Sequence, residues 1–154
     1  MTTRARILTC LAGSGLAVFA LIPFPYLAAP RWDVWVVDEA GAPIDGMTVR
    51  RVYRSYSTES EEHTEDQVTD KRGYAAFPVR WSSASTAQRC EFTVLSALAF
   101  VHASFGSHAY VFAFGNGKEG SAVSGQYVTD WTGELDYMRS RIQAEPLRFP
   151  APAR

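Results

Sequence analysis

Three histidines are the residues of this 154-residue chain whose type best suits metal binding. His63 lies in an acidic segment, whereas His102 and His108 flank a short Ser/Phe/Gly segment. Imidazole and carboxylate groups are both common ligands of zinc. However, no His-x-His, His-x-x-x-His or Cys-x-x-Cys pair occurs, and a hairpin would be needed to bring His102 and His108 together. We therefore predict that the histidines are structural and that the protein holds no metal.

Acidic residues in the middle of the chain could instead hold calcium, which prefers clustered oxygen ligands. They are Glu59, Glu61, Glu62, Glu65, Asp66 and Asp70. Their spacing differs from that of a helix–loop–helix calcium site, so we expect a solvated, exposed loop from Ser57 to Asp66. A basic cluster of Arg50, Arg51 and Arg54 precedes that loop. We expect these arginines to pair with the acidic loop, and anionic lipid headgroups are the alternative partner.

Two further patterns match parts of catalytic or cofactor motifs. Ser104 and Ser107 lie near two of the histidines, but no Gly-x-Ser-x-Gly elbow accompanies them, so a hydrolase triad is not indicated. The segment Gly115–Gly120 has the dinucleotide-binding spacing, which requires a helix to open at its third glycine. The residues after it lack helical periodicity, so we expect a glycine-rich hairpin loop. The sequence thus predicts no catalytic residue, no cofactor and no enzymatic activity.

Tryptophans could serve a different function, because exposed aromatic faces stack on sugars and other small ligands. The chain has Trp32, Trp35, Trp81 and Trp131. If they are exposed and coplanar, a carbohydrate-binding or small-ligand-binding domain is indicated. Nucleic acid is not an expected partner, because the net charge of −1 provides no global basic field.

The N-terminal part carries no charged residue from Ile7 to Ala29, and Arg4 and Arg6 precede it. A helix of roughly 20 apolar residues crosses a lipid bilayer, and arginines ahead of it hold the N-terminus in the cytoplasm. We therefore predict a cytoplasmic N-terminus over residues 1–6 and a single-pass transmembrane anchor, or uncleaved signal, over residues 7–29. The lipid bilayer is then a partner, and the rest of the chain faces the periplasmic or extracytoplasmic side.

A cleaved signal peptide followed by secretion is the alternative for this segment. The apolar stretch before Pro23 has the length of a signal-peptide core. Cleavage after Ala29 would leave Pro30 at the mature N-terminus, which disfavours processing. The uncleaved anchor is therefore preferred, and a buried core helix is the third alternative.

The rest of the chain has the composition of one folded domain, with 47% apolar and 20% charged residues overall. We place this domain at residues 32–145, followed by a Pro/Ala tail over residues 146–154. Cys10 would lie in or near the lipid, so a disulfide with Cys90 is not expected.

Short β-rich segments between turn residues predict a mainly β fold of the sandwich type. The expected strands are Trp32–Asp38, Met47–Tyr56, Tyr74–Val79, Glu91–Ser104 and His108–Phe114, with a short helix over Phe92–Phe100 as the alternative for the fourth. Neither face of Met47–Tyr56 is cleanly apolar, so this strand is expected at a sheet edge. Gly41, Gly46 and Gly73 are expected in turns, where the backbone needs a positive φ.

One amphipathic helix is expected near the C-terminal end of the domain. Its apolar stripe is formed by Trp131, Leu135, Met138 and Ile142, which recur at helical spacing. Pro146 would end the helix. We expect the stripe to pack on the core, and a partner-binding face is the alternative.

Two motifs resemble those of carboxypeptidase-regulatory-like domains. Val36–Gly46 reads Val-Val-Asp-Glu-Ala-Gly-Ala-Pro-Ile-Asp-Gly, which is similar to the strand and Pro-Ile-x-Gly turn that open that family's fold. Thr69–Phe77 is similar to its second signature, Thr-Asp-x-x-Gly-x-x-x-Phe. The resemblance extends over residues 32–79. It implies a transthyretin-like or immunoglobulin-like β-sandwich without catalytic residues, of the kind found as an accessory module outside membranes.

The leading prediction is therefore a membrane-anchored, non-enzymatic interaction or structural module of the cell envelope, with a protein partner there. The alternative is an extracytoplasmic domain that binds a small ligand or carbohydrate. A metal-dependent enzyme is a third hypothesis, which depends on the histidines alone.

Overall fold

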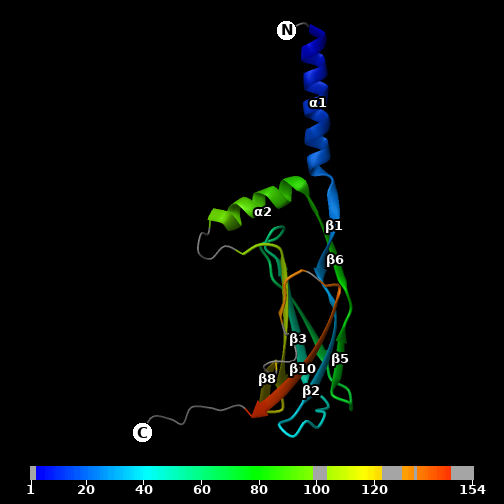
Figure 1. Cartoon of the computed structure of the whole chain (residues 1–154), viewed down its shortest axis with the longest axis vertical. Helices are drawn as coiled ribbons and strands as arrows, with labels where there is room; N and C mark the ends of the chain where they lie inside the picture. Colours follow the sequence, from blue (N-terminus) through cyan, green and yellow to red (C-terminus); the bar gives the residue numbers. More distant parts are fainter. Residues whose placement is uncertain (1–2, 99–103, 123–129, 134, 147–154) are drawn as a thin grey trace, which may run out of the picture.

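The computed structural model describes residues 3–98, 104–122, 130–133 and 135–146, and this part of the chain has a mainly β fold (Figure 1). The helices are α1 (Thr3–Leu21) and α2 (Thr86–Leu98). The strands are β1 (Pro23–Ala29), β2 (Arg31–Val37), β3 (Thr48–Ser55), β4 (His63–Val68), β5 (Tyr74–Phe77), β6 (Arg80–Ser85), β7 (Ser107–Gly115), β8 (Lys118–Ala122), β9 (Asp130–Trp131) and β10 (Tyr137–Pro146).

An eight-stranded sheet forms the body of the protein. Its strands follow the order β4-β3-β7-β8-β10-β2-β5, and β9 pairs with β7. β10 and β2 run parallel, whereas the other pairs described in this sheet are antiparallel. The sheet curves until its edge strands β4 and β5 come into contact, so it nearly closes around the core. The larger core side chains are Trp32, Val34, Val36, Met47, Val49, Phe77, Val111, Trp131 and Ile142.

β1 and β6 form a separate antiparallel ribbon between the sheet and the helices. β1 continues into β2 through Pro30, and β6 follows β5 after Pro78. Proline has no backbone N–H to donate to a ladder, so it suits the points where the chain leaves the sheet. At the outer end of the ribbon Pro23 pairs with Ser85, which places the end of α1 beside the start of α2 (Figure 1).

β2 shows how the sequence sets the two faces of the sheet. Side chains alternate along a strand, so Trp32 and Val34 point into the core while Arg31 and Asp33 point outward. Trp32 is fully buried and donates its indole N–H to Oγ of Ser140 in β10 at 2.8 Å. This hydrogen bond satisfies the indole inside the core and ties β2 to its parallel neighbour.

Four of the predicted strands are confirmed, namely Trp32–Asp38, Met47–Tyr56, Tyr74–Val79 and His108–Phe114, as β2, β3, β5 and β7. The glycine predictions are confirmed as well, because Gly41, Gly46 and Gly73 have φ values of 82°, 72° and 69°. The edge position expected for Met47–Tyr56 is wrong, since β3 lies between β4 and β7. β3 tolerates Arg50 and Arg51 in the interior of the sheet because they meet the acidic residues Asp66 and Glu65 on β4.

The amphipathic helix expected near the C-terminal end is wrong. Residues Tyr137–Pro146 form β10, in which Ser140, Ile142 and Ala144 are buried and alternate with more exposed residues. A spacing of four, as between Met138 and Ile142, fits a helix and also a strand, whose period is two. The spacing of the apolar residues therefore did not distinguish a helix from a strand.

Two further expectations need correction. The strand preferred for Glu91–Ser104 is wrong up to Leu98, because those residues belong to α2, and residues 99–103 of that prediction lie outside the described ones. The expected loop Ser57–Asp66 ends early, because β4 begins at His63 and pairs with β3. The prediction of a two-layered sandwich is confirmed only for its mainly β content, because a single curved sheet encloses the core.

The predicted anchor at residues 7–29 is not one continuous helix. α1 ends at Leu21, and Pro23, which cannot continue the helical hydrogen bonds, begins β1. In the part of the chain that the structure describes, we find no helix with both the length and the apolar character needed to cross a membrane.

Candidate functional site

Asp33 is a buried carboxylate on the outer face of the sheet. β2 places it between β5 and β10, opposite Ala76 on one side and Arg139 on the other. Neighbouring side chains cover it, so that only 6% of the residue is exposed. A charged group that is removed from water in this way needs hydrogen-bonding partners.

Two tyrosines supply the partners of Asp33. Tyr74 of β5 donates its hydroxyl to Oδ1 at 3.0 Å, and Tyr137 of β10 donates to Oδ2 at 2.7 Å. Nε of Arg31 forms an ion pair with Oδ1 at 3.6 Å. Burial, together with the hydrogen bond to Asp33, raises the pKa of Tyr74, so this phenol remains a donor at neutral pH. Both carboxylate oxygens are therefore occupied as acceptors.

Arginines surround the two tyrosine rings. Nε of Arg139 donates to the hydroxyl of Tyr137 at 2.7 Å, and its guanidinium lies 5.1 Å from the centroid of that ring. This hydrogen bond raises the pKa of Arg139. Arg31 lies 5.6 Å from the same ring centroid, and Arg72 lies 5.7 Å from that of Tyr74. The result is a cationic and aromatic surface around one negative charge.

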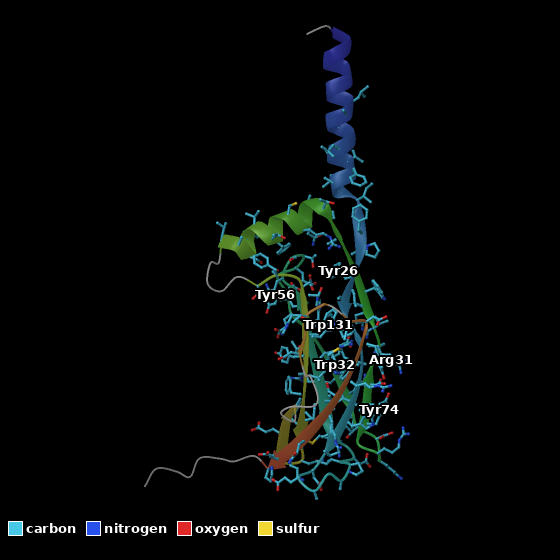
Figure 2. The ribbon with its side chains drawn as sticks, viewed as in Figure 1. Tyr26, Arg31, Trp32, Tyr56, Tyr74 and Trp131 are labelled. Atoms are coloured by element: carbon cyan, nitrogen blue, oxygen red, sulfur yellow. The ribbon has the colours of Figure 1, made fainter. Side chains whose placement is uncertain are left out.

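A groove of about 480 Å³ opens at this cluster. Its lining residues are Asp33, Trp35, Arg72, Tyr74 and Arg139. Trp35 packs against Tyr74 with ring centroids 5.3 Å apart. Figure 2 shows Arg31 and Tyr74 on the outer side of the sheet, whereas Trp32 and Trp131 lie between the strands. Half-buried rings beside exposed guanidinium groups suit a ligand with a flat apolar surface and an anionic group.

Arg51 forms a second buried polar cluster, inside the curve of the sheet. Its side chain is fully buried, and Nη1 donates to the carbonyl oxygens of Pro30 at 2.8 Å and Pro78 at 2.9 Å. Nη2 meets Oε2 of Glu65 at 2.6 Å, and Oε1 of Glu65 accepts from Nε of Arg80 at 2.7 Å. Pro30 and Pro78 lie where strands leave the sheet, and Glu65 lies on β4, so the cluster is a structural joint between the sheet and the ribbon.

The pairing expected between the basic cluster and the acidic segment is confirmed for Arg50 and Arg51, whereas Arg54 lies 4.6 Å from the ring centroid of Tyr56. Arg50 binds both carboxylate oxygens of Asp66 at 2.7 Å, and Arg51 binds Glu65. Asp70 is engaged elsewhere, because its Oδ1 accepts the backbone N–H groups of the turn that precedes β5. The carboxylates considered for calcium thus include four that already have cationic or backbone partners, namely Glu59, Glu65, Asp66 and Asp70.

The histidines are not brought together among the described residues. Nε2 of His63 lies 3.0 Å from Oε2 of Glu59, and its ring stacks on Tyr53. His108 lies on β7 with its ring 6.0 Å from that of Tyr110, and His102 falls outside the described residues. In the described ranges no three His, Cys, Asp or Glu side chains gather in an arrangement that could hold a metal ion. The metal-free state stays a prediction.

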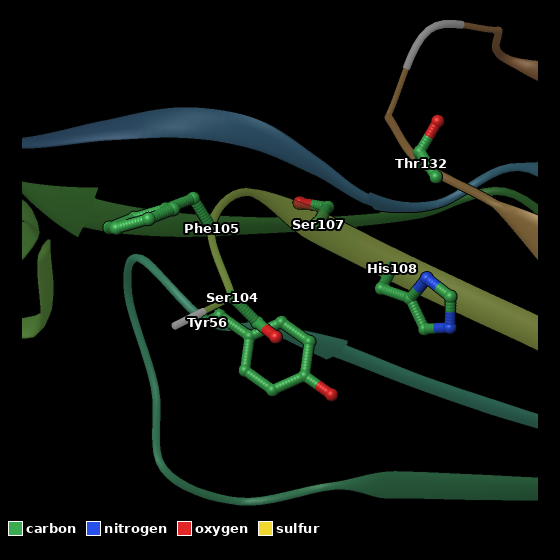
Figure 3. Close-up of a pocket in the computed structure, with 6 residues that line it drawn as sticks. All are labelled: Tyr56, Ser104, Phe105, Ser107, His108 and Thr132. Atoms are coloured by element: carbon green, nitrogen blue, oxygen red, sulfur yellow. The ribbon is translucent and has the colours of Figure 1, made fainter. Parts of the chain in front are cut away.

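The serines considered for a hydrolase line a cavity of about 310 Å³ (Figure 3). Ser104 and Ser107 share it with His108, whose ring points away from both serines in the figure. The hydroxyl of Ser107 donates to the carbonyl oxygen of Leu27 at 3.1 Å. This hydroxyl links β7 to the ribbon and is therefore used structurally.

The glycine-rich motif and the tryptophans can also be placed. Gly115–Gly120 forms the hairpin between β7 and β8, which confirms the predicted loop, and Asn116 and Gly117 adopt the positive φ values that such turns require. Trp32 and Trp131 are buried and offer no stacking face to a ligand, whereas Trp81 is 64% exposed. The four tryptophans therefore do not form an exposed, coplanar surface.

The cluster of Asp33, Tyr74 and Tyr137 was not predicted from the sequence. Asp33 was visible as a charged residue inside an otherwise apolar and aromatic strand, which is a usable signal for a buried polar site. Its two hydroxyl partners lie 41 and 104 residues further along the chain, so only the fold brings them together.

No family model and no curated protein matches this chain. Among solved structures, 3-chlorocatechol 1,2-dioxygenase from Rhodococcus opacus 1CP is similar with 12% identity and a TM-score of 0.43, over 78% of this chain and 61% of that one. Catechol 1,2-dioxygenase from Pseudomonas arvilla C-1 is similar with 14% identity and a TM-score of 0.41, over 83% and 56%. The chain thus spans less than two thirds of either structure, and similarity this low carries no information about its own chemistry.

Proposed function

We propose that this chain is a membrane-anchored, non-enzymatic interaction module of the cell envelope. The observation that carries the proposal is the apolar surface of α1 and of the residues after it. Leu11, Leu16, Val18, Phe19, Leu21 and Ile22 are between 46% and 70% exposed. Large exposed apolar surfaces mark contacts with membranes or partners, and no side chain from Leu11 to Leu21, the part of α1 whose side chains are described, is buried in the domain.

The anchor of this proposal extends past α1. The uncharged part of the helix, Ile7 to Leu21, is about 22 Å long at about 1.5 Å per residue, which is shorter than the hydrocarbon core of a bilayer. The next residues, Ile22 to Pro25, are exposed and uncharged and would extend the apolar segment. Arg4 and Arg6 would keep the N-terminus in the cytoplasm and place the β domain on the opposite side.

Two features support an interaction module rather than an enzyme. Asp33 has both oxygens occupied by hydrogen bonds, and Glu65 is held between two arginines, so neither carboxylate is poised as a general base. The resemblance of residues 32–79 to carboxypeptidase-regulatory-like domains, with their transthyretin-like sandwich, agrees with an accessory role. Its turn glycines adopt the positive φ that those motifs require.

Membrane fractionation with a carbonate wash tests the proposal. The full-length protein should stay with the membranes. Replacing Leu16 and Phe19 together by Lys should release it, whereas Val68→Lys, at a similarly exposed apolar residue of β4, should not. Recovery of a soluble mature chain that begins within residues 21–35 would overturn the anchor and indicate a cleaved signal.

The groove at Asp33 supports a second candidate, in which the domain binds an acidic saccharide or a similar small ligand. The supporting observation is the position of Arg72 and Arg139 beside Trp35 and Tyr74 in one groove. An array of neutral and acidic oligosaccharides tests it. Binding of acidic members that Trp35→Ala and Arg139→Ala both abolish would support this candidate, and no binding to any member would oppose it.

A further inference from the structure

α2 turns a mixed side toward the body of the protein, where its Phe92 and Leu95 line a cavity of about 360 Å³ together with Tyr56. The residues of α2 that are half-buried are Gln88, Arg89, Phe92 and Ser96. Nε2 of Gln88 donates to the carbonyl oxygen of Thr58 at 2.7 Å, and Oγ of Ser96 donates to that of Tyr56 at 3.1 Å. No residue of α2 is buried. The helix is thus attached to the domain mainly through hydrogen bonds.

The opposite side of α2 is apolar and faces away from the domain. It is formed by Ala87, Cys90, Val94, Ala97 and Leu98, which recur at intervals of three and four residues. All five are exposed, and Val94 and Leu98 keep 58% and 64% of their surface accessible. A helix on the surface of a soluble domain has the reverse arrangement, with its apolar stripe on the core. This inverted stripe indicates that an apolar partner outside the domain covers the exposed side of α2.

The position of α2 identifies that cover. Because Pro23 pairs with Ser85, the first residues of α2 are fixed next to the last residues of α1. Nη2 of Arg89 donates to the carbonyl oxygen of Phe24 at 3.2 Å, and its guanidinium lies 5.2 Å from the ring centroid of Tyr26. Figure 1 shows α2 starting beside the lower end of α1 and extending away from it to one side. The apolar side of α2 therefore begins where the exposed apolar residues of α1 end.

We propose that α2 lies in the lipid–water interface, with Val94 and Leu98 toward the acyl chains, and thereby holds the β domain in one orientation on the membrane. This inference rests on the proposed anchoring through α1. Arg89 and Glu91 give α2 no net charge, so attachment depends on apolar burial and needs no anionic lipid. Because α1 already holds α2 at the membrane surface, the burial of α2 alone does not have to offset the entropy that is lost on association with the membrane.

Site-specific quenching in phosphatidylcholine vesicles tests the proposal on the full chain. Cys90 lies on the apolar side of α2 and is exposed, so it can carry a thiol-linked fluorophore in a Cys10→Ser variant. Lipids with a doxyl group near the headgroup should quench this fluorophore strongly and independently of salt. A label introduced by Lys71→Cys, in the exposed turn before β5 and without other cysteines, should not be quenched. Val94→Asp together with Leu98→Asp should reduce quenching at Cys90 several-fold, whereas Val68→Asp should leave it unchanged.

A third label, introduced by Leu16→Cys without other cysteines and measured with lipids whose doxyl group lies deep in the acyl chain, separates this inference from the anchor on which it rests. Quenching of both labels supports the interfacial position of α2. Quenching at position 16 without quenching at Cys90 overturns that position and leaves the anchor intact, and an accompanying concentration-dependent dimer would assign the apolar side to a second copy of the chain. Quenching at neither position overturns both proposals.

Discussion

Arg51 and Glu65 meet at 2.6 Å across the β3–β4 ladder, with the arginine side chain fully buried. The same guanidinium donates to the carbonyl oxygens of Pro30 and Pro78, where β1 and β6 leave the sheet. One ion pair thus joins the edge of the sheet to the ribbon that carries the helices. Because the proposed membrane contacts lie at the far end of that ribbon, this joint determines how firmly the β domain is held relative to them.

Glu65→Gln should lower the free energy of unfolding by about 2–3 kcal/mol, because it leaves the buried charge of Arg51 without its carboxylate. Urea-induced unfolding, followed by tryptophan fluorescence in detergent, measures the loss. The control is Asp66→Asn in the next position of β4, where the pair with Arg50 is exposed and the loss should stay below about 1 kcal/mol. Equal losses in the two variants would contradict a special role for the buried pair.

Stability should depend on pH through Glu65. Burial alone would raise its pKa, but the hydrogen bond from Arg80 and the charge of Arg51 outweigh this effect and place the pKa below the ordinary value. A pKa that is lower in the folded state adds stability that is complete above the unfolded-state value of about 4.3 and disappears as the pH falls through the folded-state value. The free energy of unfolding should therefore fall under acidic conditions, and less steeply in Glu65→Gln. Parallel pH profiles of the two proteins would rule out this contribution.

Gly73→Ala should destabilise the domain more than Gly46→Ala. Both glycines have positive φ values, which cost another residue about 1–2 kcal/mol. A Cβ atom at Gly73 would also overlap the carbonyl oxygen of Val36, whereas nothing lies within 4 Å of one at Gly46. Thermal unfolding of the two variants checks this order, and a larger effect at Gly46 would show that the turn at Gly73 can adjust.

Asp33→Asn should lower the pKa of Tyr74 without returning it to its ordinary value, because burial remains after the hydrogen bond to a charged carboxylate is lost. Ultraviolet difference titration measures phenol ionisation, and Tyr74→Phe identifies which step belongs to this residue. If Asp33→Asn left that step unchanged, the hydrogen bond from Tyr74 to Asp33 would not form in solution.

The strands and turns near the N-terminal end of the domain were predictable because their signals are local. Gly41, Gly46 and Gly73 provide positive φ within a few residues of the strands they connect, and β-branched and aromatic residues mark those strands. β10 was not predictable in this way, since the interval between Met138 and Ile142 fits both a helix and a strand. Its position between β8 and β2 decides the structure.

The polar clusters were predictable only in part. The acidic segment and the arginines of β3 lie close enough along the chain for their pairing to be expected. The burial of Arg51 depends on the carbonyl groups of Pro30 and Pro78, which only the three-dimensional fold brings to it. The inverted stripe of α2 also escaped notice, because a sequence pattern does not reveal which side of a helix faces its domain.

The central claim is that the β domain is held on the non-cytoplasmic side of a membrane by its N-terminal segment. Labelling of spheroplasts with a membrane-impermeant maleimide tests it most directly, with Lys71→Cys as the labelled site in a chain whose two native cysteines are replaced by Ser. The protein should sediment with membranes and should be labelled fully before lysis. Labelling that appears only after lysis would contradict this claim.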